Sequence, residues 1–96
     1  GEHIQMLPLN VFFPFANHPY QIRDDPEMAE TLQSVSERGV LQPILARPRQ
    51  QGGYEIISGH RRLRACELAG LKEIPAIIRD MDDEEAIIVM VDSVRP

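Results

Sequence analysis

Residues 57–70 read Ile-Ser-Gly-His-Arg-Arg-Leu-Arg-Ala-Cys-Glu-Leu-Ala-Gly, and they combine the end of a strand, a glycine turn and a basic helix start. The stretch begins as the end of a strand that closes in a Ser-Gly turn. The remainder predicts a short helix, because Leu63, Cys66 and Gly70 recur at three- to four-residue spacing along one side. Ser58 is expected to cap the start of this helix, and Gly70 is expected to end it.

Three arginines, Arg61, Arg62 and Arg64, crowd the first two turns of this helix. A cation at a helix start opposes the helix dipole and costs about 0.3 to 1 kcal/mol. The N–H groups of a helix start, next to a glycine that lets a ligand approach, form an anion site, and arginines add bidentate donors. The stretch therefore predicts a phosphate site; the alternative is a solvated basic face that nearby glutamates balance.

Residues 58–65 resemble the Gly-Glu-Arg-Arg-x-Arg-Ala box of ParB-type partition proteins, within the wider ParB/sulfiredoxin-like fold. His60 departs from that box, because ParB proteins usually carry Glu there. Residues 39–44, Gly-Val-Leu-Gln-Pro-Ile, are similar to the first nucleotide-contacting motif of ParB. Residues 17–23 partly match an Asn-Pro-Tyr-Gln-Pro-Arg segment of the same domain. The resemblance covers about residues 17–92.

Length and composition indicate one small globular domain of 96 residues. The net charge of −5 argues against a duplex-binding surface within this segment, because such a surface must neutralise phosphates. The single cysteine cannot form an internal disulfide and is typical of a reducing compartment. The longest apolar run, residues 86–91, is far shorter than the roughly 20 residues that cross a bilayer. We therefore expect a cytoplasmic protein without membrane association, and a chain opening at Gly1 suggests a domain excised from a longer protein.

Outside this stretch the pattern predicts alternating strands and helices. Residues 4–9 are expected to form an edge strand that Pro8 ends. An irregular loop, anchored by three phenylalanines, is expected over residues 10–25. A helix should follow over residues 26–38, with Asp25 as its N-cap.

A hairpin comes next, with a strand over residues 44–47, a turn over residues 48–53 and a returning strand over residues 54–57. After the arginine helix, residues 73–79 predict a short strand. Its Pro75 implies that this strand lies at an edge or carries a bulge.

The last helix opens at Asp82 with an Asp-x-x-Glu capping box. Its apolar stripe is predicted to be Ile87, Met90, Val91 and Val94. The whole order of elements predicts an α+β domain with a small mixed sheet and about three helices. The resemblance implies the same ParB/sulfiredoxin-like fold.

The resemblance also implies a pocket for cytidine triphosphate (CTP) between the two motifs and the last helix. The partition protein would bind DNA through a helix-turn-helix domain after this one, and a homodimer is possible. The nucleotide contacts carry over to these matching positions: Gly39, Val40, Leu41, Gln42, Pro43, Ser58, Gly59, His60, Arg61, Arg62 and Arg64. A third ParB motif, Glu-Asn-x-x-Arg, supplies Mg²⁺ and phosphate ligands; residues 92–95 match it loosely, which leaves Asp92 as the metal candidate.

His60 is the one catalytic candidate. A histidine beside three arginines is a poor cation, so we expect a neutral imidazole that can bond to a phosphate or orient a water. Replacing the usual Glu removes a negative charge, so phosphate affinity is expected to be kept or raised and hydrolysis to fall. Any enzyme activity would then be weak CTP hydrolysis.

Other functions stay open on the same fold: a sulfiredoxin-like or kinase-like enzyme, a nuclease, or a module that keeps the fold without a nucleotide response. Gly59 stands where the Gly-Cys-His-Arg turn of sulfiredoxins carries its cysteine, so the essential thiolate is absent, and Cys66 is expected to be structural. A nuclease usually needs a cluster of carboxylates for metal ions, and the box here is basic.

Overall fold

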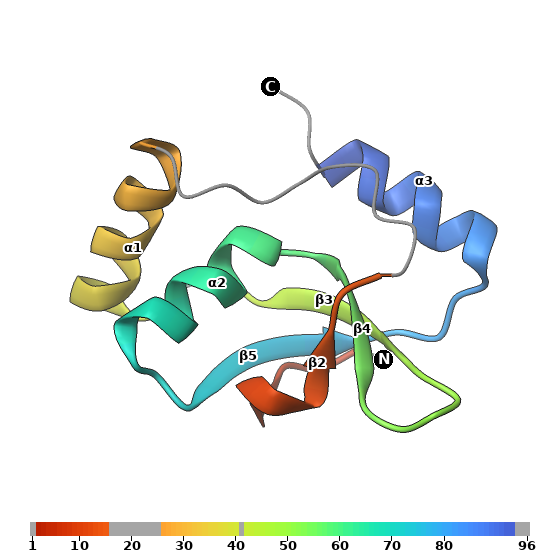
Figure 1. Cartoon of the computed structure of the whole chain (residues 1–96). Helices are drawn as coiled ribbons and strands as arrows, with labels where there is room; N and C mark the ends of the chain where they lie inside the picture. The colour runs from red at the N-terminus through yellow and green to blue at the C-terminus, as the bar shows by residue number, and fades with distance from the viewer. Residues whose placement is uncertain (1, 16–25, 41, 94–96) are drawn as a thin grey trace.

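The computed structural model describes residues 2–15, 26–40 and 42–93. Its strands are β1 Gln5–Pro8, β2 Phe12–Phe13, β3 Ile44–Pro48, β4 Tyr54–Ser58 and β5 Glu73–Ile78. Its helices are α1 Pro26–Arg38, α2 His60–Ala69 and α3 Asp83–Ser93, with a 3-10 turn at Leu9–Val11. The predicted α+β fold with a mixed sheet and three helices is confirmed (Figure 1).

The strands form one sheet in the order β1-β5-β3-β4-β2. The pairs β1/β5 and β3/β4 are antiparallel, whereas β3/β5 and β2/β4 are parallel. Helices α1 and α2 pack against each other, and α3 contacts β4 at the other end of the molecule (Figure 1). The β3–β4 turn and the start of α3 lie on the side of the molecule away from α1 (Figure 1).

The prediction that Pro75 places its strand at an edge was wrong, because β5 lies between β1 and β3. The register explains why proline is tolerated there. Pairing with β3 begins at Ala76, one residue after Pro75, so only β1 flanks the strand at the proline, through Met6. The missing N–H therefore interrupts no pairing with β3.

The loop expected over residues 10–25 is partly regular where the structure describes it. The 3-10 turn at Leu9–Val11 leads into β2, which pairs in parallel with β4 through Phe12 and Tyr54. A strand of two residues carries no alternating pattern, so the sequence could not reveal it.

The three phenylalanines divide between core and surface. Phe12 and Phe15 are buried, as expected, but Phe13 is 40% exposed. The partial match to ParB at residues 17–23 and the expected N-cap Asp25 lie outside the described residues.

Helix α1 ends where expected. The N–H of Gly39 donates to the carbonyl of Val35 at 2.8 Å, which closes the last turn. Met28 and Val35 are buried and Leu32 is half-buried, so one apolar side of this helix faces the core.

Helix α2 starts one residue later than predicted, because Gly59 and not Ser58 is its N-cap. Ser58 still pairs with Leu45 of β3, so the chain can turn only at the next residue. That turn requires a φ of 102° at Gly59, which glycine adopts without strain. The end at Gly70 is confirmed, since its N–H donates to the carbonyl of Glu67 at 3.2 Å.

Helix α3 begins with the predicted capping box, in which Asp82 Oδ1 accepts the N–H of Glu85 at 2.8 Å. Its burial face, however, differs from the predicted stripe.

The core face of α3 consists of Ala86 and Met90, whereas Ile87 and Val91 are 43% and 45% exposed. Every residue from Ala86 to Val91 is apolar, so the pattern alone marks no single face. Packing on Ile57 selects the buried side. Of the predicted stripe only Met90 is confirmed, and Val94 lies outside the described residues.

Two hydrophobic clusters hold these layers together. The larger one includes Ile44 and Cys66 and is shared by the sheet, α1 and α2. The smaller one lies under α3 and includes Phe15 and Ile57. In the part of the chain that the structure describes, no helix has the length and apolar character to cross a membrane.

Cys66 is fully buried, and burial raises the pKa of its thiol, with a further contribution from the charge of Glu67. A raised pKa leaves less thiolate at neutral pH, and a buried thiol reacts only when the fold opens. We expect iodoacetamide to alkylate Cys66 at least about tenfold more slowly in the folded chain than in urea, measured by mass spectrometry. Equal rates in the two states would contradict a structural role.

Candidate functional site

Arg62 joins the two segments that the sequence predicts to contact a nucleotide. Its Nη1 atom donates to the carbonyl of Gln42 at 2.6 Å and to the carbonyl of Pro43 at 2.8 Å. The guanidinium is half-buried, and this burial lowers its pKa. The start of α2 is thereby tied to the turn that follows α1, and Arg62 is not part of a solvated basic face.

Gly59 allows α2 to begin directly against the sheet. A Cβ atom at this position would lie 2.5 Å from Cγ2 and 2.9 Å from Cβ of Ile44, the first residue of β3. Real Cβ atoms do not approach other carbons so closely. The glycine therefore fixes how near the helix start comes to the Gln42–Pro43 turn.

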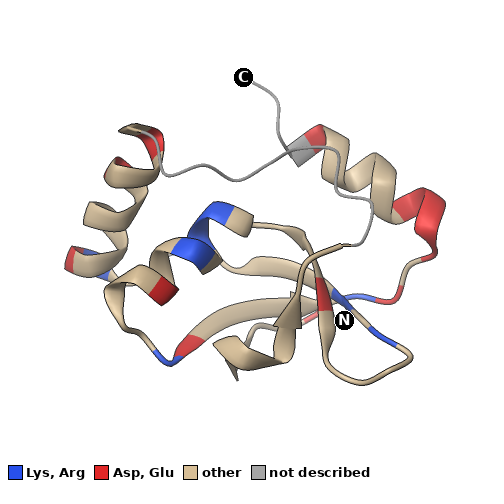
Figure 2. Ribbon diagram, viewed as in Figure 1, with Lys and Arg blue, Asp and Glu red and all other residues tan. Residues whose placement is uncertain are grey.

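The helical hydrogen bonds of α2 begin at Leu63, whose N–H donates to the carbonyl of Gly59 at 3.0 Å. The N–H groups of residues 60–62 therefore come before the first helical hydrogen bond. Gly59 offers no side-chain cap, and His60 is the first residue of the helix. This arrangement, with basic residues around it as Figure 2 shows, is typical of an anion site.

Arg61 reaches toward α1 instead of the sheet. Its Nη2 atom lies 3.4 Å from Oε2 of Glu27, and the two side chains are 34% and 77% exposed. An ion pair so open to water contributes little, so an anion of higher charge can replace Glu27 at small cost. Arg64 is half-buried on the same helix.

A pocket of about 350 Å³ lies beside this junction, between α1, the turn after it and Arg62. Of the predicted nucleotide residues, those that line it are Gly39, Val40, Gln42 and Arg62. Those that do not line it are Pro43, Ser58, Gly59, His60, Arg61 and Arg64, and Leu41 lies outside the described residues. The volume is within the range of small-ligand sites.

Sequence reasoning missed the wall that α1 contributes to this pocket. Glu30, Thr31 and Ser34 line it, and Glu27 pairs with Arg61 one turn earlier. These polar residues recur at three- to four-residue spacing beside the apolar side of α1. That polar stripe was a signal that could have pointed to the pocket.

The two remaining candidates lie apart from the pocket lining. His60 is half-buried, with its Nε2 atom enclosed, and Asp92 is exposed near the end of α3. Across residues 2–15, 26–40 and 42–93, His, Cys, Asp and Glu side chains form no group of three that could hold a metal ion. Metal binding by Asp92 therefore stays a prediction.

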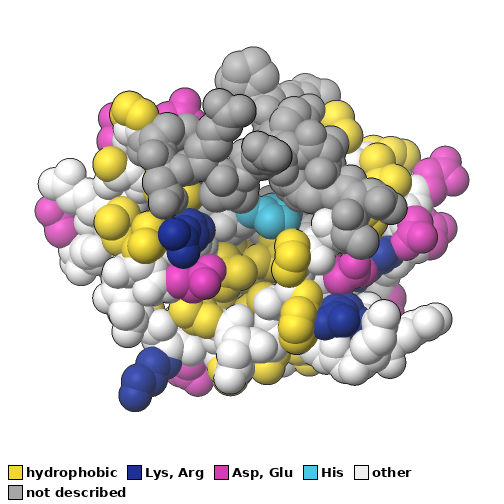
Figure 3. Space-filling model, in the orientation of Figure 1, with side chains coloured by type: hydrophobic (Ala, Val, Ile, Leu, Met, Phe, Trp, Pro, Cys, Tyr) yellow, Lys and Arg dark blue, Asp and Glu magenta, His cyan; other side chains and the backbone are white. Residues whose placement is uncertain are grey.

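Basic side chains do not form a continuous plane on the face seen in Figure 3, where Lys and Arg appear as separate spots. Three consecutive acidic residues, Asp83, Glu84 and Glu85, lie in the first turn of α3, and other acidic residues are spread over α1, α2 and the sheet, as Figure 2 shows. This charge pattern suits a local phosphate site better than a duplex-binding surface.

Comparison with known proteins identifies the family of this chain and supports its fold. The family described as the ParB N-terminal domain matches residues 1–93. A probable chromosome 1-partitioning protein ParB from Deinococcus radiodurans is 45% identical over 87 residues, which make up 91% of this chain and 30% of that protein. The chain spans about a third of the length of the curated relatives it matches first.

Two solved structures share the fold. A C-terminally truncated chromosome-partitioning protein ParB from Caulobacter crescentus, complexed with CTP-gamma-S, aligns with a TM-score of 0.86 and 32% identity, covering 98% of this chain and 54% of that one. Sulfiredoxin from Arabidopsis thaliana aligns with a TM-score of 0.73 and 25% identity, covering 92% of this chain and 97% of that one. The expected resemblance to the ParB/sulfiredoxin-like fold is confirmed.

Proposed function

Because this chain belongs to the ParB N-terminal domain family, we propose that it is the CTP-binding module of a ParB-like partition protein. The observation that carries the proposal is the position of Arg62, which binds the Gln42–Pro43 turn to the start of α2. These are the two segments at which the family resemblance places the nucleotide. The relative solved with CTP-gamma-S, which shares the fold closely, supports CTP as the nucleotide.

The proposed roles follow from charge and geometry. The triphosphate lies at the N-terminus of α2, where N–H groups, Arg61 and Arg64 favour an anion. The nucleoside contacts residues 39–43, the segment that resembles the first nucleotide-contacting motif of ParB. Arg61 exchanges its exposed partner Glu27 for phosphate oxygens.

Mg²⁺ and hydrolysis belong to the same proposal. Mg²⁺ on a nucleotide is held mostly by phosphate oxygens and water, with one or two carboxylates, so Asp92 is suited in kind to supply one ligand. His60 is the candidate for bonding to phosphate or orienting water, and hydrolysis is expected to be slow. DNA is bound through domains outside this segment, in a cytoplasmic homodimer.

The test is calorimetric titration of the chain with CTP, ATP, GTP and UTP in the presence of Mg²⁺. We expect CTP to bind at least about tenfold more tightly than the others, because a pocket with polar groups set for one base leaves them unpaired with another. Arg61→Gln should weaken CTP binding at least about tenfold while changing the free energy of unfolding by less than about 1 kcal/mol.

The matched control is Arg38→Gln, which removes the same charge from the exposed last turn of α1. It should leave CTP affinity unchanged. Absence of heat with all four nucleotides would overturn nucleotide binding, and an equal loss in both variants would show a general charge effect.

A sulfiredoxin-like activity is not favoured, although sulfiredoxin shares the fold. Gly59 occupies the turn position that would need a cysteine thiolate, and Cys66 is buried in the core with a raised pKa.

A further inference from the structure

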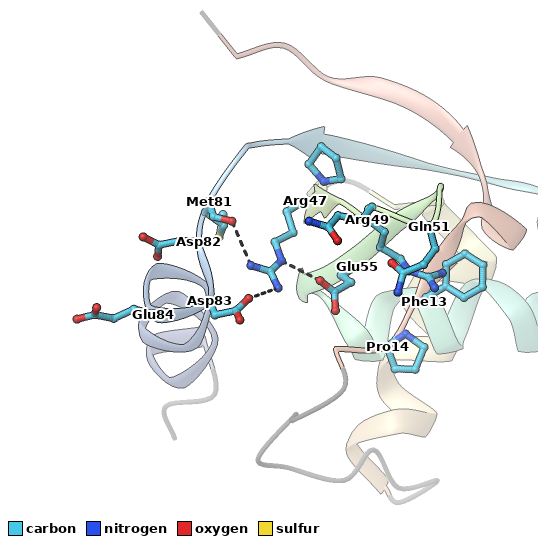
Figure 4. A pocket seen from close by; sticks show the side chains of 12 residues that line it. Phe13, Pro14, Arg47, Arg49, Gln51, Glu55, Met81, Asp82, Asp83 and Glu84 are labelled. Atoms are coloured by element: carbon cyan, nitrogen blue, oxygen red, sulfur yellow. Dashed lines mark hydrogen bonds and ion pairs between the residues drawn. The ribbon is translucent and has the colours of Figure 1, made fainter.

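A second groove, of about 970 Å³, lies between the β3–β4 turn, the end of β2 and the start of α3 (Figure 4). None of its lining residues lines the pocket beside Arg62. It is therefore a separate concave surface that the proposed nucleotide site does not use.

The floor of the groove is an arginine whose charge is already balanced. Arg47 is 12% exposed and donates to Glu55 Oε1 at 2.8 Å, to Asp83 Oδ1 at 2.7 Å and to the carbonyl of Met81 at 3.1 Å, as Figure 4 shows. Its guanidinium also lies 5.0 Å from the ring centroid of Phe15. Burial alone would lower the pKa of Arg47, but its bonds to Asp83 and Glu55 outweigh burial and raise it.

One wall of the groove is aromatic and held in place on two sides. The guanidinium of Arg49 lies 3.9 Å from the ring centroid of Phe13. The same ring packs over the backbone of Gly53, where a Cβ atom would come within 2.7 Å of it. Phe13 nevertheless remains 40% exposed, and Pro14 extends the wall. A long aliphatic side chain can lie along such a surface.

The rim opposite this wall is negative. The lining contains two guanidinium groups against four carboxylates. Glu55 and Asp83 balance Arg47, so Asp82 and Glu84, both exposed, provide negative charge beyond what that arginine needs. Asp82 uses one oxygen to accept the N–H of Glu85, and its side chain still lines the groove.

We propose that this groove binds a basic peptide segment of a partner protein. The aliphatic part of one Lys or Arg side chain would lie along Phe13 and Pro14, and other basic residues of the same segment would meet Asp82 and Glu84, whose side chains point outward from the start of α3 (Figure 4). The uncompensated carboxylates repel phosphate, so nucleic acid and free nucleotide are not its ligands. Charge complementarity with a chain of net charge −5 also favours encounter with basic partners.

The test is a fluorescence anisotropy titration with a fluorescein-labelled peptide of alternating Gly and Arg. A peptide of alternating Gly and Glu serves as the control of opposite charge. We expect the arginine peptide alone to bind, and its affinity to fall as ionic strength rises. Asp82→Asn with Glu84→Gln should weaken binding about five- to tenfold, since exposed charge pairs contribute modestly. Asn keeps the cap acceptor of Asp82, so α3 should still start at the same place.

The matched control is Glu67→Gln with Glu73→Gln, which changes the net charge equally at two residues that do not line the groove. It should reduce affinity less than about twofold. Equal losses in the two double variants, binding of the acidic peptide, or no binding of the arginine peptide would each overturn the proposal. Binding of a labelled single-stranded DNA to the native chain that is weakened by Asp82→Asn with Glu84→Gln would overturn it as well. None of these outcomes depends on CTP binding.

Discussion

Gly59→Ala is expected to lower the free energy of unfolding by about 3 kcal/mol or more. The residue has a φ of 102°, which strains any side chain, and the added Cβ would lie 2.5 Å from Ile44 Cγ2. Both the strain and the overlap occur where α2 starts, so CTP binding should be lost with them. A chain of this size has about 5 to 14 kcal/mol of stability in total, so the variant would be severely weakened.

The matched control is Gly52→Ala in the β3–β4 turn. Gly52 has a similar φ of 96°, but nothing lies within 4 Å of the Cβ it would gain. It should cost only the conformational strain, about 1 to 2 kcal/mol. Urea unfolding of both variants measures the difference, and equal losses would show that the contact with Ile44 is unimportant.

A double-variant cycle isolates this contact further. Ile44→Ala removes Cγ2, the atom that the new Cβ would approach most closely, but keeps the Ile44 Cβ, and it leaves a cavity in the core. The combined Gly59→Ala and Ile44→Ala variant should therefore lose less stability than the two single losses added together. Strict additivity would contradict a steric cause.

Arg62→Gln is expected to cost about 2 to 3 kcal/mol of stability and at least about tenfold in CTP affinity. Glutamine is too short to reach the carbonyls of both Gln42 and Pro43, so at least one bond from a charged donor is lost. The turn that lines the pocket would then be held less firmly against α2.

Arg61→Gln is the matched comparison for this variant. Its ion pair with Glu27 is exposed, so its removal should leave urea unfolding nearly unchanged while still weakening CTP binding. Arg62→Gln should therefore lower both the stability and the CTP affinity, whereas Arg61→Gln should lower the CTP affinity alone. If Arg62→Gln unfolds at the same urea concentration as the native chain, its proposed role in holding the turn is wrong.

Local chemistry was sufficient to predict most element boundaries. Gly39 and Gly70 end their helices, and Asp82 caps α3, because each of these features depends on hydrogen bonds between residues three or four positions apart. The turn between β3 and β4 follows from its glycines in the same way. The two motifs that resemble ParB were also visible as short runs, since a helix start with crowded arginines is a local pattern.

The kind and order of the elements, and the identity of the basic helix start, can therefore be predicted from local patterns. The partners of the arginines depend on the folded arrangement: Arg62 bonds to carbonyls 20 and 19 residues away, and Arg47 bonds to Met81 and Asp83, 34 and 36 residues away. The buried face of α3 was likewise selected by packing on Ile57. Such partners depend on how separate elements are packed in three dimensions, and a one-dimensional period of two or 3.6 residues carries no information about that packing.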